Sequence, residues 1–144
     1  MRLQPTLRLR PRNRAMTTKL NIVCVSGTRE NLQMAAMFAA TAAVSGSEVS
    51  VFLSMNALGY FVKDKRRSAP AEGEIGLLME TKHVPAFEDL FRQAAELGDA
   101  KLYPCSMAME VLGIMETQLE PYIEKPVGLT KYLSDIEDGH VMTF

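Results

Sequence analysis

The sequence predicts an α/β domain with a mostly parallel sheet that helices cover on both faces. Short, β-branched apolar runs alternate with helical patterns along the chain, in the order β-α-β-α-β-α-α-β. The length of 144 residues suits one domain, and 47% hydrophobic with 23% charged residues is typical of a globular protein. We therefore expect a single domain over residues 18–144, with its chemistry at the carboxyl ends of the strands.

The first half of this domain has two apolar runs that we expect to be strands, residues 19–26 and 48–55. Between them, the Ala- and Met-rich stretch 31–44 is apolar around most of its circumference, which predicts a well-buried helix. Residues 56–62 are expected to form a short helical turn. The polar stretch 63–74 is expected to be a mobile loop.

The second half begins with residues 75–84, whose pattern is ambiguous, and continues with an amphipathic helix over 84–98. Pro85 is expected in the first turn of this helix, and its inner face would consist of Phe87, Leu90, Phe91, Ala94, Ala95 and Leu97. The remaining predicted elements are a strand over 100–105, helices over 106–113 and 126–138, and a last strand over 140–144.

Three strand-to-helix junctions should meet at one edge of the sheet, because the carboxyl ends of parallel strands lie together. They are Ser26-Gly27-Thr28, Ser54-Met55-Asn56 and Pro104-Cys105-Ser106. The third junction contains Cys105, at or next to the start of a helix. Free N–H groups and the positive end of the helix dipole favour a thiolate there, and the thiolate is the nucleophilic form of cysteine. The alternative is an unreactive cysteine that happens to fall at a strand end.

The bulk composition argues against several classes of protein. A net charge of −1 and 7% aromatic residues do not suit a nucleic-acid-binding surface. The two cysteines are far apart, which indicates free thiols in a reducing, cytosolic compartment, and Cys24 between two valines should behave as a small buried hydrophobe. Isolated histidines predict no metal site, and no apolar run is long enough to span a membrane.

Four further features have both an ordinary and a functional interpretation. The turn 26–31 is either an ordinary turn capped by Thr28 or Asn31, or an anion site; it matches no nucleotide-binding motif. His83 is either a solvated loop residue or a base. The cations Lys63, Lys65, Arg66 and Arg67 either face water or attract an anionic partner. The methionines Met55, Met107, Met109 and Met115 either fill the core or form a partner surface.

Residues 1–17 differ from the rest of the chain. Residues 1–16 contain five Arg, two Pro and no acidic residue, and lack the apolar run of a signal peptide. We expect a disordered basic extension, with a targeting presequence as the alternative, and Met16 is an alternative start of the protein.

The stretch YPCSMAMEVLGI, which contains Cys105, resembles the motif of the soluble DsrE/DsrF-like proteins, and the opening stretch from Asn21 to Leu58 resembles the same family. The resemblance implies a flavodoxin-like three-layer α/β sandwich, assembled into homo-oligomers or hetero-oligomers. It also implies that Cys105 takes up sulfane sulfur from small molecules, as a persulfide or thiosulfonate. The cysteine would exchange this sulfur in the cytoplasm with a TusA-like carrier or a rhodanese, without a cofactor. Cys24 does not match a second family cysteine, which argues against an internal relay.

The motif and the predicted edge together give a set of candidate substrate-binding residues, which are Ser106, Met107, Met109, Gly27, Thr28 and Asn56. Two other classes of function stay open. The chain could be a non-catalytic subunit of a sulfur-relay complex with an inert Cys105. It could also be a flavin or nucleotide binder, although it has no phosphate loop. The apolar stretches 56–62 and 107–115 predict surfaces for oligomerisation.

Overall fold

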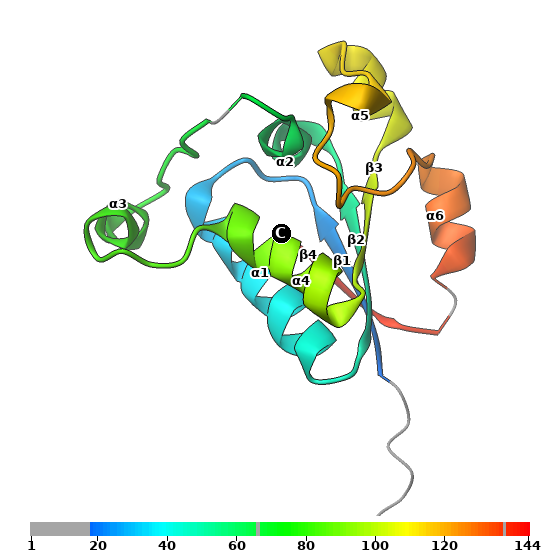
Figure 1. Ribbon diagram of the computed structural model, residues 1–144, viewed down its shortest axis with the longest axis horizontal. Coiled ribbons are helices and arrows are strands. Elements are labelled where there is room, and N and C mark those ends of the chain that lie inside the picture. The colour runs from blue at the N-terminus through cyan, green and yellow to red at the C-terminus, as the bar shows by residue number, and fades with distance from the viewer. Residues whose placement is uncertain (1–17, 66, 137) are drawn as a thin grey trace, which may run out of the picture.

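The computed structural model describes residues 18–65, 67–136 and 138–144 (Figure 1). The predicted basic extension over 1–17 lies outside the described residues. The sheet has four strands, β1 (Lys19–Cys24), β2 (Glu48–Leu53), β3 (Lys101–Pro104) and β4 (His140–Thr143), in the order β3-β2-β1-β4. All neighbouring strands are parallel, as predicted.

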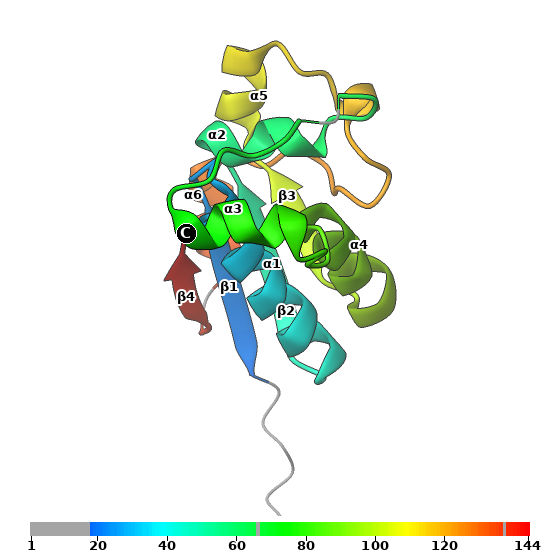
Figure 2. The ribbon, with the colours of Figure 1, turned by 90° about the vertical axis from the view of Figure 1, so that its left-hand side faces the viewer.

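Helices lie on both faces of this sheet (Figure 1). Helices α1 (Arg29–Val44) and α4 (Phe87–Gly98) cover one face, and α6 (Leu129–Asp135) lies against the other. The short elements α2 (Met55–Leu58), η1 (Gly59–Phe61), α5 (Ser106–Leu112) and η2 (Glu116–Gln118) follow β2 and β3 at their carboxyl ends (Figure 2). This arrangement confirms the predicted three-layer, flavodoxin-like α/β fold.

The face under α1 and α4 holds the main core. Strand residues that alternate toward it are almost fully buried, namely Leu20, Ile22, Cys24, Val49, Val51, Leu53 and Leu102. The buried side of α1 consists largely of alanines, which lets α4 approach closely. At the closest point, a Cβ on Gly98 would collide with the Cβ of Ala43, so packing requires glycine there. The residue with left-handed backbone geometry that ends α4 is Asp99, at φ 56°, rather than Gly98.

Three helical predictions need correction. Helix α1 is only half buried, because Met34 and Met37 are exposed on its outer side. Helix α4 begins at Phe87 with Ala86 as N-cap, so Pro85 precedes the helix rather than occupying its first turn. Leu97 is 77% exposed. At about 100° per residue it lies about 80° from Phe87, outside the stripe formed by Phe87, Phe91 and Ala94.

The ambiguous stretch 75–84 contributes most of a helix, α3 (Glu74–Thr81), which lies across the N-terminal end of α1 (Figure 2). The carboxylate of Glu30 holds its start by accepting the N–H groups of Glu72, Gly73 and Gly76 at 2.8–3.1 Å. These bonds lower the pKa of Glu30, the one from Glu72 most strongly. Arg29 donates to the Gly76 carbonyl at 2.7 Å. A tertiary contact, rather than local pattern, therefore fixes α3.

The outer edge of β3 is covered by the irregular segment 119–128. Ile123 and Val127 form parallel bridges to Leu102 and Cys105. The Glu124 N–H donates to the Leu102 carbonyl at 2.8 Å, and the Val127 N–H donates to the Pro104 carbonyl at 3.1 Å. This segment satisfies the backbone groups that an edge strand would otherwise expose.

Candidate functional site

The three predicted junctions lie side by side at the carboxyl edge of the sheet. The Ser54 N–H donates to the Cys24 carbonyl at 3.0 Å, and the Cys105 N–H donates to the Leu53 carbonyl at 2.8 Å, so the ladder continues into each junction. A Cβ on Gly27 would lie 2.9 Å from the Cβ of Asn56, so the first two turns touch. The structure therefore gathers the candidate residues Gly27, Asn56 and Cys105 at one edge, as the topology predicted.

Cys105 is the N-cap residue of α5. Its backbone is extended, with φ −68° and ψ 121°, and its carbonyl accepts the N–H of Met109 at 3.0 Å. The helix then ends at Gly113, at φ 66°. The predicted placement of Cys105 at the start of a helix is thus confirmed.

The side chain of Cys105 lies on the α6 side of the sheet. Side chains alternate along a strand, so an extended Cys105 points to the same face as Lys101 and Tyr103. Cys105 is only 4% exposed. It bridges to Val127, whose carbonyl accepts the Ser106 N–H at 3.0 Å, so segment 119–128 lies against it. Access to this thiol requires a local displacement of that cover.

Cys24 has the opposite placement. It lies on the α1 side of the sheet and is 1% exposed. Burial raises the pKa of its thiol from 9.0 to about 12. A thiol in this position stays protonated at neutral pH and packs as an apolar side chain. The sheet separates it from the face of Cys105, which argues against a relay between the two cysteines.

The residues next to Cys105 differ in exposure. Ser106 and Met107 are exposed, whereas Met109 is 6% exposed and belongs to the core. Met55 and Met115 are 53% and 64% exposed. Core filling is therefore wrong for Met55, Met107 and Met115, although it is right for Met109. Together with Val111 and Leu112, the exposed methionines on and after α5 form an apolar surface beside the buried thiol.

The turn 26–31 already contains a carboxylate from the chain itself. Glu72 accepts hydrogen bonds from the Thr28 hydroxyl at 2.8 Å and from the Asn31 amide at 2.7 Å. Thr28 is the N-cap of α1, but its side chain makes no capping bond. An anionic ligand at this turn would meet the like charge of Glu72, which favours the interpretation as an ordinary turn.

The other candidate side chains lie apart from this edge. His83 is exposed after the end of α3, at φ 53°, as expected for a solvated loop residue. Lys63 donates to the Thr117 carbonyl at 3.2 Å, while Arg66 lies outside the described residues. Within the described ranges, no group of three or more His, Cys, Asp or Glu residues could hold a metal ion. In the same residues, no helix has the length and apolarity to cross a bilayer.

Sequence analysis missed one polar site on the α6 face. Asn21 and Ser50 lie in the floor of a cavity there, and hydrogen bonds link them to Tyr132 in its wall. The available signal was that polar residues alternate with apolar ones at the start of two strands, as Lys19 and Asn21 in one and Glu48 and Ser50 in the other. Such alternation indicates a strand with one polar face.

Comparison with known proteins places these features in context. The sequence model of the DsrE/DsrF/DrsH-like family matches residues 69–144, just over half of the chain, including Cys105. No curated protein sequence matches. Among solved structures, the ychN protein from E. coli is similar over 90% of this chain and 100% of its own, with a TM-score of 0.64 and 14% identity.

A second similar structure is the protein of unknown function MTH1491 from Methanobacterium thermoautotrophicum. The similarity covers 88% of this chain and 99% of that protein, with a TM-score of 0.57 and 8% identity. At these identities both likenesses bear on the fold alone.

Proposed function

The chain belongs to the DsrE/DsrF/DrsH-like family, and we propose that it is a sulfur carrier that takes up sulfane sulfur on Cys105 and exchanges it with a TusA-like partner. The observation that supports this most directly is the position of Cys105. It lies within the matched region and caps α5 at the carboxyl edge of the sheet. Residues 18–144 would act as its single domain.

Uptake from thiosulfate would proceed by nucleophilic displacement. The Cys105 thiolate attacks the sulfane sulfur, the S–S bond of thiosulfate breaks, and sulfite leaves with the electron pair of that bond. The product is a Cys105 persulfide anion. With tetrathionate, the same attack leaves a thiosulfonate group on Cys105 and releases thiosulfate. Both steps balance without an added oxidant or reductant, so the mechanism requires no cofactor.

Release would run through the thiolate of a partner. A partner thiolate attacks the outer sulfur of the persulfide, the bond to Cys105 breaks, and the Cys105 thiolate is regenerated. A TusA-like carrier or a rhodanese would supply this thiolate in the cytoplasm. The apolar surface of Met107, Val111, Leu112 and Met115 is the part of the chain that we assign to this partner, or to another copy of the chain.

Burial of Cys105 sets a requirement on this mechanism. Only 4% of the surface of residue Cys105 is exposed, which leaves little of it for a protein partner to reach. Docking would have to displace α5 or segment 119–128, which is held beside β3 by few backbone bonds. Between encounters, the same cover would protect a persulfide from other thiols.

Intact mass spectrometry tests the proposal. After incubation with thiosulfate or tetrathionate, the full chain should gain the mass of the corresponding sulfur adduct, and a reduced TusA-like protein should remove it. Cys105→Ser should gain nothing, while the matched control Cys24→Ser should behave as the wild type. Uptake of the same mass by Cys105→Ser would refute the assignment.

The burial of Cys105 also favours a second candidate, a non-catalytic subunit of a sulfur-relay complex. In that case Cys105 would pack as an apolar side chain, and partners would bind around it without exchange. Sulfur flux through the reconstituted complex separates the two candidates. Flux should fall to background with Cys105→Ser if the chain is a carrier, and should be unchanged if it is a structural subunit.

A further inference from the structure

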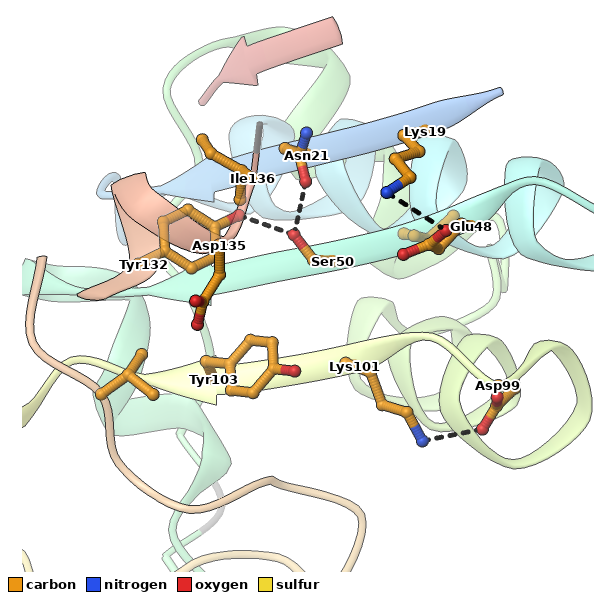
Figure 3. Close-up of a pocket in the computed structure, with 12 residues that line it drawn as sticks. Lys19, Asn21, Glu48, Ser50, Asp99, Lys101, Tyr103, Tyr132, Asp135 and Ile136 are labelled. Carbon is orange, nitrogen blue, oxygen red and sulfur yellow. Dashed lines mark hydrogen bonds and ion pairs between the residues drawn. The ribbon is translucent and has the colours of Figure 1, made fainter. Parts of the chain in front are cut away.

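The α6 face of the sheet contains a cavity of about 280 Å³ that Cys105 does not line. Its floor is formed by polar residues of β1, β2 and β3, and its wall by Tyr132, Asp135 and Ile136 at the end of α6 (Figure 3). A sheet covered on both faces normally has apolar side chains on both. A polar floor across three adjacent strands is therefore unusual, and packing does not explain it.

The floor is an ordered hydrogen-bond chain. The Ser50 hydroxyl donates to the side-chain oxygen Oδ1 of Asn21 at 2.7 Å. Because this uses the one proton of the Ser50 hydroxyl, the same oxygen accepts the Tyr132 hydroxyl at 2.9 Å. Register supports the arrangement, because Ser50 lies between Asn21 and Lys101 on adjacent strands. The amide nitrogen of Asn21 has no hydrogen-bond partner among the described residues and lies against Gly139. These groups are fixed before any ligand arrives.

The rim carries charges of both signs. Lys19 pairs with Glu48 at 3.8 Å. Lys101 pairs with Asp99 at 2.8 Å and with Glu124 at 3.8 Å, and Asp135 pairs with Lys131 at 2.8 Å. The carboxylate of Asp135 projects from α6 toward the rings of Tyr132 and Tyr103 (Figure 3). An anion alone would meet the carboxylates, and a cation alone would meet the ammonium groups. The pairs of Lys101 and Asp135 are solvent-exposed and therefore weak, so a molecule with both charges can replace them at its two ends.

The two tyrosines separate the charged ends. The centroids of the Tyr103 and Tyr132 rings are 6.3 Å apart and their planes are inclined by 60°, which leaves ring surface beside Asp135. Aromatic faces attract ammonium groups. Desolvation raises the pKa of both tyrosines, so the rings stay neutral at physiological pH.

We propose that this cavity binds a small zwitterion of the amino-acid or dipeptide class, with its ammonium group at Asp135 beside the tyrosine rings and its carboxylate toward Lys101. The volume equals that of about nine water molecules at roughly 30 Å³ each, which suits a molecule of that size. The rim is partly solvated, since Lys101 and Asp135 are 45% and 54% exposed, so binding is weak and of order millimolar. The proposal does not depend on sulfur transfer.

NMR titration of the full, ¹⁵N-labelled chain with glycylglycine tests this site. Saturable shifts are expected at the amides of Ser50, Lys101 and Tyr132. N-acetylglycine lacks the ammonium group and glycinamide lacks the carboxylate, so each should bind several-fold more weakly. Asp135→Asn should weaken glycylglycine binding about fivefold. The matched control Asp138→Asn removes the same charge outside the cavity and should leave binding unchanged.

Several outcomes would overturn the proposal. They are the absence of saturable shifts, equal shifts with glycinamide or N-acetylglycine, or an equal loss of binding in both Asp variants. Lys101→Met provides a second test if Asp135→Asn disturbs α6, because it should reduce binding while the amide spectrum of α6 is retained. Cys105→Ser should bind glycylglycine as the wild type does, which separates this result from the test of sulfur transfer. A cavity covered by a second copy would resist titration and would likewise contradict the proposal.

Discussion

On the α1 and α4 side of the sheet, the strands present Leu20, Ile22, Cys24 and Leu102, all at most 8% exposed. On the α6 side, the same strands present Lys19, Asn21 and Ser50 together with Lys101 of β3. One face therefore holds the main core, whereas the other combines a polar floor with the smaller contact between Phe52 and Tyr132. Each cysteine belongs to one of these faces, so the comparison also concerns which thiol can react.

The two thiols are expected to show the largest difference. At pH 8, a thiol with a pKa of about 12 has a thiolate fraction on the order of one in ten thousand. Cys24 is also reached only by extensive unfolding, whereas local opening of segment 119–128 suffices for Cys105. Iodoacetamide should modify Cys24→Ser at least on the order of a thousandfold faster than Cys105→Ser. Equal rates would contradict a functional difference between the faces.

The next largest effect concerns stability. Leu102→Ala removes a fully buried side chain from the α1 and α4 face and should cost about 2–5 kcal/mol. Its neighbour Lys101 points to the other face and is half exposed, so Lys101→Ala should change stability by less than about 0.5 kcal/mol. Urea unfolding of both variants measures this contrast. A similar loss in both would mean that the α6 face also carries core packing.

Alkaline pH should destabilise the fold through Cys24. Burial raises the pKa of the folded Cys24 thiol above its ordinary value of 9.0, so the unfolded state releases its proton first and stability falls as pH rises above 9. The loss approaches about 1.4 kcal/mol per pH unit, or about 2 kcal/mol by roughly pH 10.5. Cys24→Ala should lack this component. The contribution of Tyr132, whose pKa is also raised, is common to both proteins and cancels in the comparison. Parallel stability curves from pH 8 to 10.5 would contradict it.

The smallest effect tests the polar face. Tyr132→Phe retains the ring that stacks on Phe52 at 4.7 Å but removes the bond to Ser50, and should cost about 1 kcal/mol. Tyr103→Phe, on the adjacent β3, is the matched control and should change stability by less than about 0.5 kcal/mol. Thermal unfolding measures both. A larger loss of stability for Tyr103→Phe would mean that the hydroxyl of Tyr103, rather than the hydrogen bond between Tyr132 and Ser50, stabilises this face.

Sequence patterns predicted the features that depend on local order. The strands followed from apolar runs, and the N-cap position of Cys105 followed from a strand that runs directly into a helix. The burial of Cys105 could not be predicted, because its cover is the irregular segment 119–128. Helix α3 could not be predicted either, since its start depends on hydrogen bonds to Glu30, more than forty residues earlier.

The polar site of Asn21, Ser50 and Tyr132 could not be predicted from the sequence for a related reason. Asn21 and Ser50 each stand alone within an apolar strand, and neither indicates a site by itself. Their convergence depends on the register of β1 with β2 and on Tyr132, which lies 82 positions after Ser50. Spacing along a single chain does not contain that information.

Segment 119–128, which covers β3, also determines how copies of this sheet can meet. It leaves β4 as the sheet edge whose outer side pairs with no described residue. A sheet with two open edges can add copies without limit and form fibres. With one edge closed, edge-to-edge growth must stop after two copies. The same short segment that covers the Cys105 thiol therefore also limits edge-to-edge association.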